Sequence, residues 1–154
     1  MANIGSYPAG TTVRNLIYSI MPKQQNILHL VKDDDDLPPW VLMLISRATS
    51  NIGMVEEFVK YYYTPQVAAM AGWQAELNAA PQILDQYQKM FHSGQMVRSL
   101  LYSVHFRETS ILSMIKDNAQ VPPWIIMKLS RATDDISTVN EYLTYEYAKL
   151  AGKV

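Results

Sequence analysis

The fold is decided by two stretches that repeat each other, residues 13–63 and residues 97–147. The first stretch has the sequence VRNLIYSIMPKQQNILHLVKDDDDLPPWVLMLISRATSNIGMVEEFVKYYY. The second has the sequence VRSLLYSVHFRETSILSMIKDNAQVPPWIIMKLSRATDDISTVNEYLTYEY. At a constant offset of 84 residues, 22 of the 51 positions are identical and no gap is needed. We therefore expect each copy to form one supersecondary unit, and the two units to be related by a pseudo-two-fold or a stacked arrangement.

The first half of each copy has the spacing of apolar residues that is typical of an amphipathic helix. In the first copy these residues are Val13, Leu16, Ile17 and Ile20. Pro22 interrupts the pattern, and a proline inside a helix costs about 3 kcal/mol. The sequence predicts two short helices with a break at residues 20–22, and a single kinked helix is the alternative.

The second half of each copy predicts one long helix that begins at a Pro-Pro-Trp sequence. Prolines fit the first helical turn, where the missing backbone N–H would lack a partner in any case. About 25 residues follow without a proline, which corresponds to a helix of about 37 Å. In the first copy the apolar stripe expected to be buried comprises Trp40, Met43, Leu44, Ala48, Ile52, Val55, Phe58 or Val59, and Tyr62. In the second copy it comprises Trp124, Met127, Ala132, Ile136, Val139, Leu143 and Tyr147.

Together these patterns predict an all-α protein, a pseudo-two-fold helical bundle of two duplicated units joined by a helical connector. We assign residues 1–12 to an extended N-terminal arm, 13–63 to the first repeat and 64–96 to the connector. Residues 97–147 form the second repeat, and residues 148–154 a C-terminal tail. The chain of 154 residues suits one compact domain or two small ones.

The composition excludes several classes of protein. With 49% hydrophobic and 18% charged residues, the chain is not an intrinsically disordered polypeptide. It has no cysteine, which excludes a disulfide scaffold, an iron–sulfur protein and a thiol enzyme. The net charge is −1 and no segment concentrates positive charge, so we do not expect direct contact with nucleic acid. The first residues lack the pattern of a secretory signal, and no apolar run has the length of a membrane span, so we expect no membrane partner.

The residues that most often bind metal ions do not have the spacing of a metal site. The acidic run Asp33–Asp36 lacks the alternating ligands and the turn glycine of a calcium-binding loop, and indicates a solvated loop near a helix N-terminus. The histidines His29, His92 and His105 are scattered, and none has a second histidine three or four positions away. The sequence therefore predicts no metal and no cofactor.

No constellation of residues predicts catalysis. There is no glycine-rich phosphate loop and no nucleophile elbow. The adjacent carboxylates Glu56 and Glu57, like Asp134 and Asp135, point to different faces of a helix and make poor acid–base partners. We therefore expect a protein that is not an enzyme, with no catalytic residue and no small-molecule substrate.

Two sets of residues are candidates for packing and for binding. The first set, the structural anchors, comprises Pro38, Pro39, Trp40, Arg47, Pro122, Pro123, Trp124 and Arg131. We expect each tryptophan to pack on a neighbouring helix and each arginine to make an ion pair or a carbonyl contact with the other copy. The second set, the candidate interface, comprises Tyr61, Tyr62, Tyr63, Tyr142, Tyr145 and Tyr147. At least one tyrosine of each cluster must face outward, and tyrosine is favoured at protein–protein interfaces; packing in the core and at its rim is the alternative.

Residues 96–143 resemble a small helical module found in structural proteins of tailed bacteriophages. That module has a first helix with a basic-x-x-Leu pattern, an acidic loop, then Leu-Pro-x-Trp-Val and a helix that ends in Asp-Tyr-x-x-Thr-x-x-x-Tyr-Leu. In the second copy the matching residues are Arg98, Leu100, Asp117, Pro122, Trp124, Lys128, Ala132, Asp134, Thr138, Tyr142 and Leu143. The first copy matches less fully, through Arg14, Leu16, Asp33, Leu37, Pro38, Trp40, Val41, Ala48 and Val59. It departs from the pattern at Leu44 and Phe58, where the module has lysine and tyrosine.

The resemblance implies a non-enzymatic protein of the virion, assembled in the cytoplasm of a bacterial host. We expect this chain to bind other virion proteins, or further copies of itself, through its helix faces that are rich in tyrosine and methionine. One alternative is a small phage adaptor protein that binds a host enzyme or polymerase. A second alternative is a nucleic-acid-associated protein that contacts the packaged genome, although the net charge of −1 opposes it.

Overall fold

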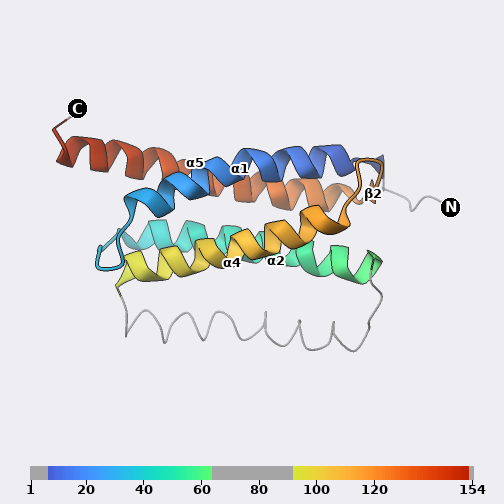
Figure 1. Cartoon of the computed structure of the whole chain (residues 1–154), viewed down its shortest axis with the longest axis horizontal. Helices are drawn as coiled ribbons and strands as arrows, with labels where there is room; N and C mark the ends of the chain where they lie inside the picture. The colour runs from blue at the N-terminus through green and yellow to red at the C-terminus, as the bar shows by residue number, and fades with distance from the viewer. Residues whose placement is uncertain (1–6, 64–91, 153–154) are drawn as a thin grey trace.

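The computed structural model describes residues 7–63 and 92–152, which form a bundle of long α-helices (Figure 1). The helices are α1 (Gly10–Leu30), α2 (Pro39–Tyr63), α4 (Ser93–Met114) and α5 (Pro123–Leu150). Two short strands, β1 (Tyr7–Pro8) and β2 (Gln120–Val121), pair at one end of the bundle. The predicted all-α class is therefore confirmed. The predicted connector lies almost entirely outside the described residues, as do the first six residues and the last two.

Helix α1 is continuous through Pro22, so the predicted break at residues 20–22 is wrong. Pro22 lies on the exposed side of the helix, while Ile20 and Ile27 on either side of it are completely buried. Because the proline removes one backbone hydrogen bond on the solvent side, packing of the buried face is sufficient to keep the helix continuous.

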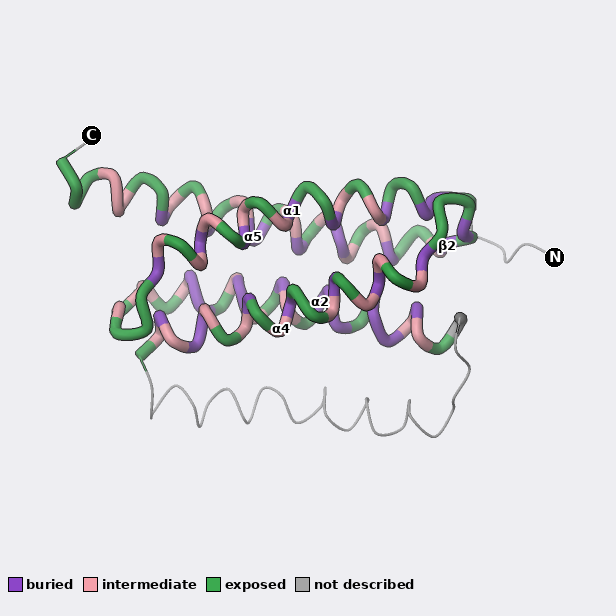
Figure 2. The backbone as a smooth tube through the Cα atoms, in the orientation of Figure 1, coloured by how far each residue is buried: buried purple, intermediate pink, exposed green. Residues whose placement is uncertain are grey.

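The buried faces of the helices repeat at the offset of 84 residues that relates the two copies. On α1 they comprise Val13, Ile17, Ile20, Gln24 and Ile27, and on α4 Val97, Leu101, Val104, Glu108 and Ile111. On α5 they comprise Ile125, Leu129, Ala132, Asp135, Ile136, Val139 and Leu143. The residues of α2 at the same positions are buried as well: Val41, Ile45, Ala48, Asn51, Ile52, Val55 and Val59. These faces point inward along each helix (Figure 2).

The long helices predicted after each Pro-Pro-Trp sequence are confirmed as α2 and α5, but the predicted stripe is wrong in part. Met43 and Met127 are 62% and 52% exposed, and Trp124 is 38% exposed. The core takes the neighbouring positions Val41 and Ile45 instead. The reason is that α2 is apolar on more of its surface than its two partner helices can cover. They cover the side with Val41 and Ile45 and leave Met43 in solvent.

The two copies interlock, because the first helix of each copy packs against the second helix of the other. Helix α1 packs on α5, and α4 packs on α2. Helices α2 and α5 pack on each other along the middle of the bundle, while α1 and α4 make a smaller contact. In Figure 1, α1 and α5 form one layer and α2 and α4 form the other. The core thus lies between helices that come from different copies.

Both ends of the bundle have close approaches between the backbones of the two copies. The N–H of Ala9 donates to the carbonyl of Ala119 (3.0 Å), and the N–H of Gly94 donates to the carbonyl of Asp35 (2.9 Å). The helices begin inside segments that the sequence assigned elsewhere: α1 begins at Gly10, within the predicted arm, and α4 begins at Ser93, within the predicted connector. Neither β1 nor β2 was expected from the sequence.

Candidate functional site

Aromatic pairs hold α2 and α5 together near both ends of their contact. The rings of Trp40 and Tyr142 meet edge to face, with centroids 4.8 Å apart. The rings of Phe58 and Trp124 make the corresponding contact at 5.2 Å. The two pairs are equivalent. Each joins the tryptophan at the start of the long helix of one copy to an aromatic residue near the end of the long helix of the other copy. Each such pair contributes about 0.5–1.5 kcal/mol beyond its buried area.

We call the contact between α2 and α5 the seam. Near its middle, Arg47 of α2 binds Asp135 of α5 through two hydrogen bonds. Its Nε donates to Oδ2 at 2.9 Å and its Nη2 donates to Oδ1 at 2.6 Å. The side chain of Asp135 is almost completely buried, while the side chain of Arg47 remains 61% exposed. The hydrogen bonds and the negative charge of Asp135 raise the pKa of Arg47 above its ordinary value. This arginine therefore makes the predicted contact with the other copy.

The corresponding arginine, Arg131, makes no ion pair with the described residues. The position that corresponds to Asp135 in the first copy is Asn51, an amide in place of a carboxylate. Arg131 is exposed on α5, and Asn51 is buried on α2. The symmetry of the seam is thus broken at one pair of positions, where a cation faces a neutral side chain.

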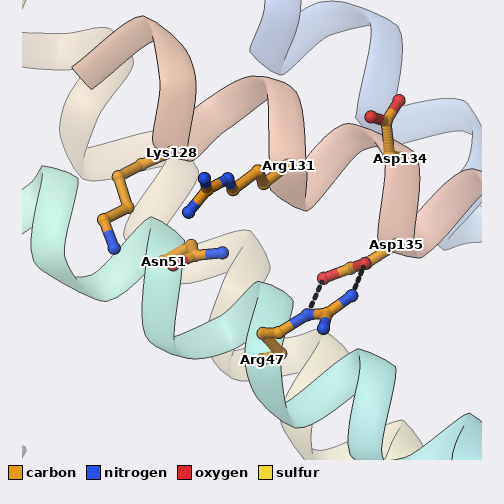
Figure 3. A pocket seen from close by; sticks show the side chains of 6 residues that line it. All are labelled: Arg47, Asn51, Lys128, Arg131, Asp134 and Asp135. Atoms are coloured by element: carbon orange, nitrogen blue, oxygen red, sulfur yellow. Dashed lines mark hydrogen bonds and ion pairs between the residues drawn. The ribbon is translucent and has the colours of Figure 1, made fainter. Parts of the chain in front are cut away.

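A pocket of about 440 Å³ opens between α2 and α5 at this place. Its lining residues are Arg47, Asn51, Lys128, Arg131, Asp134 and Asp135 (Figure 3). The side chains of Lys128 and Arg131 lie beside Asn51, whereas Asp134 points away from them. Lys128 adds a second cation where the first copy has Leu44. The pocket therefore has two basic groups that no described carboxylate neutralises.

The candidate interface tyrosines do not share one environment. Tyr61 and Tyr145, which occupy equivalent positions, are 45% and 50% exposed. Tyr142 is half-buried against Trp40. The side chains of Tyr62 and Tyr63 lie outside what the structure describes.

Tyr147 is half-buried, and its hydroxyl donates a hydrogen bond to the carboxylate of Asp35. Burial of the phenol, and then that hydrogen bond, raise its pKa above the ordinary value for tyrosine. The contact joins the last turns of α5 to the acidic loop of the first copy. In the structure this tyrosine binds another part of its own chain.

The acidic loop serves as a partner for basic side chains at one end of the bundle. Asp33 pairs with Nε of Arg98 at 3.1 Å. Asp36 lies 2.9 Å from Nδ1 of His92, and this hydrogen bond raises the pKa of the exposed imidazole above its ordinary value. Within residues 7–63 and 92–152, no three His, Cys, Asp or Glu side chains are placed to hold a metal ion.

The core also contains a polar pair that sequence reasoning missed. Glu108 and Gln24 occupy equivalent positions on α4 and α1, and both are completely or almost completely buried. The Gln24 amide lies next to the carboxyl group, yet neither Glu108 oxygen makes a hydrogen bond of normal geometry to a described residue. Burial raises the pKa of Glu108 to about 8. The acid is thus mostly neutral at pH 7.

Alignment of the two copies contains a signal for the pocket. The second copy has the charged residues Lys128 and Asp135 where the first copy has the neutral residues Leu44 and Asn51. None of the helices in the described part of the chain is long and apolar enough to cross a membrane. Comparison of the chain with protein-family models, with curated proteins and with solved structures finds no significant match.

Proposed function

We propose that this chain is a non-enzymatic structural protein of a tailed-bacteriophage virion, which binds other virion proteins or further copies of itself through its helix faces. The setting comes from the sequence resemblance of residues 96–143. The protein-binding role is supported by one observation, the duplicated set of large apolar side chains that remain exposed on the bundle.

Six of the large apolar side chains that are exposed on the described residues form three pairs 84 residues apart, while Met54, Phe106, Trp124 and Leu150 are exposed outside this pairing. Tyr18 and Tyr102 are each 50% exposed. Met43 and Met127 are exposed on α2 and α5, and Tyr61 and Tyr145 complete the set. Each of these pairs has the same residue type in both copies. Tyrosine offers contact area at a low cost in conformational entropy, and methionine adapts to irregular surfaces, so both suit protein interfaces.

The proposed setting is tested by the composition of purified particles. Mass spectrometry of particles purified on a density gradient is expected to find this chain at a fixed stoichiometric ratio to the major shell protein. Its absence from particles, together with its presence in the lysate of infected cells, would contradict the virion role and favour the adaptor alternative.

The protein-binding role is tested by variants of the exposed set. Replacement of both Met43 and Met127 by Gln is expected to leave the helical content unchanged and to lower incorporation into particles at least about tenfold, the effect of losing about 1.4 kcal/mol of binding free energy. A matched control replaces the exposed polar residues Ser50 and Glu141 by Ala and Gln. Unchanged incorporation of the methionine variant would show that these residues are not part of the interface.

A further inference from the structure

The broken symmetry at the α2–α5 seam leaves a binding site whose ligand can be deduced from its intact counterpart. We propose that the pocket formed by Asn51, Lys128 and Arg131 binds the carboxylate of an acidic side chain presented by a partner protein. The peptide nature of the ligand rests on the proposed function; the binding of a carboxylate rests on the pocket alone.

The intact half of the seam shows the geometry that Arg131 is able to adopt. Arg47 holds Asp135 by two nearly parallel N–H···O bonds of 2.9 and 2.6 Å. Such two-point contacts are the preferred arrangement between guanidinium and carboxylate groups. Arg131 has the same N–H donors as Arg47. Because residue 51 is asparagine, no carboxylate within the described chain accepts hydrogen bonds from these donors.

Two further features favour an anion over water or a neutral group. Lys128 lines the pocket beside Arg131, where Leu44 stands in the other half, so the substitution adds a positive charge. The amide of Asn51 supplies two additional N–H donors. Of the two acids in the lining, Asp135 is neutralised by Arg47 and Asp134 points away from the basic pair (Figure 3).

The size of the pocket indicates more than a free ion. Its volume of about 440 Å³ exceeds that of a carboxylate group and is sufficient for the side chain that carries it. Arg131 is exposed at the mouth, so a segment of another protein can reach it without movement of the helices. An acidic side chain on a peptide segment fits both the size and the charge.

The test measures binding to the purified full-length chain by NMR. The probe is an acetylated Gly-Glu-Gly amide, with inorganic phosphate and sodium chloride at equal ionic strength in parallel titrations. We expect saturable shifts of the Asn51 side-chain amide and of the backbone amides of Lys128 and Arg131 with the peptide. Shifts that sodium chloride reproduces, or no saturable shift, would overturn the pocket. Binding of phosphate without binding of the peptide would overturn the assignment to a carboxylate.

Three variants and a control locate the site. Asn51→Asp restores the missing carboxylate, and we expect it to pair with Arg131, to leave the fold intact and to weaken peptide binding at least about tenfold. Arg131→Gln and Lys128→Leu remove the cations from exposed or half-buried positions and are expected to weaken binding by a similar factor. Lys149→Gln removes an exposed charge at the end of α5 and serves as the control. Equal binding by Asn51→Asp and Lys149→Gln would contradict the proposal.

These outcomes are separable from those of the proposed function. The titration uses no virus particle, so a negative result overturns the pocket and leaves the composition of the virion as an independent question. If the chain is absent from particles but binds the peptide through Arg131, the pocket stands and the virion setting falls.

Discussion

Glu108 and Gln24 are equivalent residues of the two copies and lie against each other inside the core, where α4 approaches α1. A carboxylate buried in the core is not hydrated by solvent. The neighbouring Gln24 is neutral and does not compensate its negative charge. The neutral acid is therefore favoured, and the pKa of Glu108 rises to about 8. The stability of the fold is thereby linked to pH through this residue.

Replacement of Glu108 by Gln is expected to remove that dependence on pH. In the unfolded chain the pKa is near 4.5, so between this value and about 8 the folded protein binds more protons than the unfolded one. The contribution of Glu108 to the free energy of unfolding therefore falls as the pH rises through this window, by about 1.4 kcal/mol per pH unit at most, and is constant above it. Urea unfolding at pH 5, 7 and 9 is expected to show that Glu108→Gln is the more stable protein at pH 9.

The exposed Glu141→Gln serves as the control for this prediction, because its pH dependence is expected to match that of the unsubstituted chain. Parallel stability profiles of the Glu108→Gln variant and the unsubstituted chain would show that the buried acid does not titrate in this window.

Gly94 lies where the backbones of the two copies approach each other at one end of the bundle. A methyl group at this position would lie 2.3 Å from the carbonyl oxygen of Lys32, and at the equivalent Gly10 it would lie 1.7 Å from that of Lys116. Both obstacles are backbone atoms, which cannot rotate away.

Gly94→Ala is therefore expected to lower the free energy of unfolding by about 3 kcal/mol, at the upper end of the range for overpacking. The control is Ser99→Ala, at an exposed position of the same helix, with a change of less than about 0.5 kcal/mol. Thermal unfolding followed by circular dichroism measures both. A Gly94→Ala protein as stable as the control would mean that the two backbones can separate without loss.

At the scale of the element, each first helix is capped by an arginine from the other copy. The Nη1 of Arg14 donates to the carbonyl oxygens of Leu112 and Ile115 at 2.7 and 3.0 Å. The Nη1 of Arg98 makes the equivalent contacts to the carbonyl oxygens of Leu28 and Val31. These carbonyls lie in the last turn of α4 or α1 or just beyond it, where no further helical N–H can reach them and where a cation complements the helix dipole.

Removal of one cap is expected to destabilise the protein by about 1.5–3 kcal/mol, the range for a hydrogen bond to a charged group. Arg98→Gln and Arg14→Gln should have similar effects, and their double variant should show the sum, since the two sites are at opposite ends of the bundle. Chemical denaturation of the three variants tests this. Arg131→Gln, which loses no ion pair, is the control with an expected change of less than about 0.5 kcal/mol. Equal stability of Arg98→Gln and this control would show that the caps are not stabilising.

At the scale of the whole molecule, neither copy has a core of its own. The faces of α1 and α2 are covered mainly by α5 and α4, which belong to the other copy. The buried apolar area that stabilises the fold is therefore shared between segments far apart in the sequence, and half of the chain exposes that area to water.

Separate fragments of residues 1–63 and 92–154 are accordingly expected to show little helix as dilute monomers. When mixed in equal amounts, they are expected to recover the helical signal of the whole chain and to sediment as a complex. Circular dichroism and sedimentation velocity measure the two properties. A fragment that unfolds cooperatively as a monomer would contradict the interlocked arrangement.

The sequence alone determined the duplication, the all-α class and the two long helices. The reason is that the helical spacing of apolar residues and the prolines at the start of each long helix are local properties of the chain. It also predicted that Trp40 and Trp124 pack on a neighbouring helix and that Arg47 contacts the other copy, because large side chains at the edge of an apolar face need a partner. It did not identify Arg14, Arg98 or Glu108, whose roles depend on residues about 70 to 100 positions away.

Only the tertiary structure decided which helix covers which face. Packing between distant segments overrode the local cost of Pro22 and left Met43 in solvent while burying Val41. It also turned the small difference between Asn51 and Asp135 into a pocket with unbalanced charge. The physical reason is that a local pattern specifies the direction in which a helix is apolar, whereas the partner for that face is chosen by the total area that all the helices bury together.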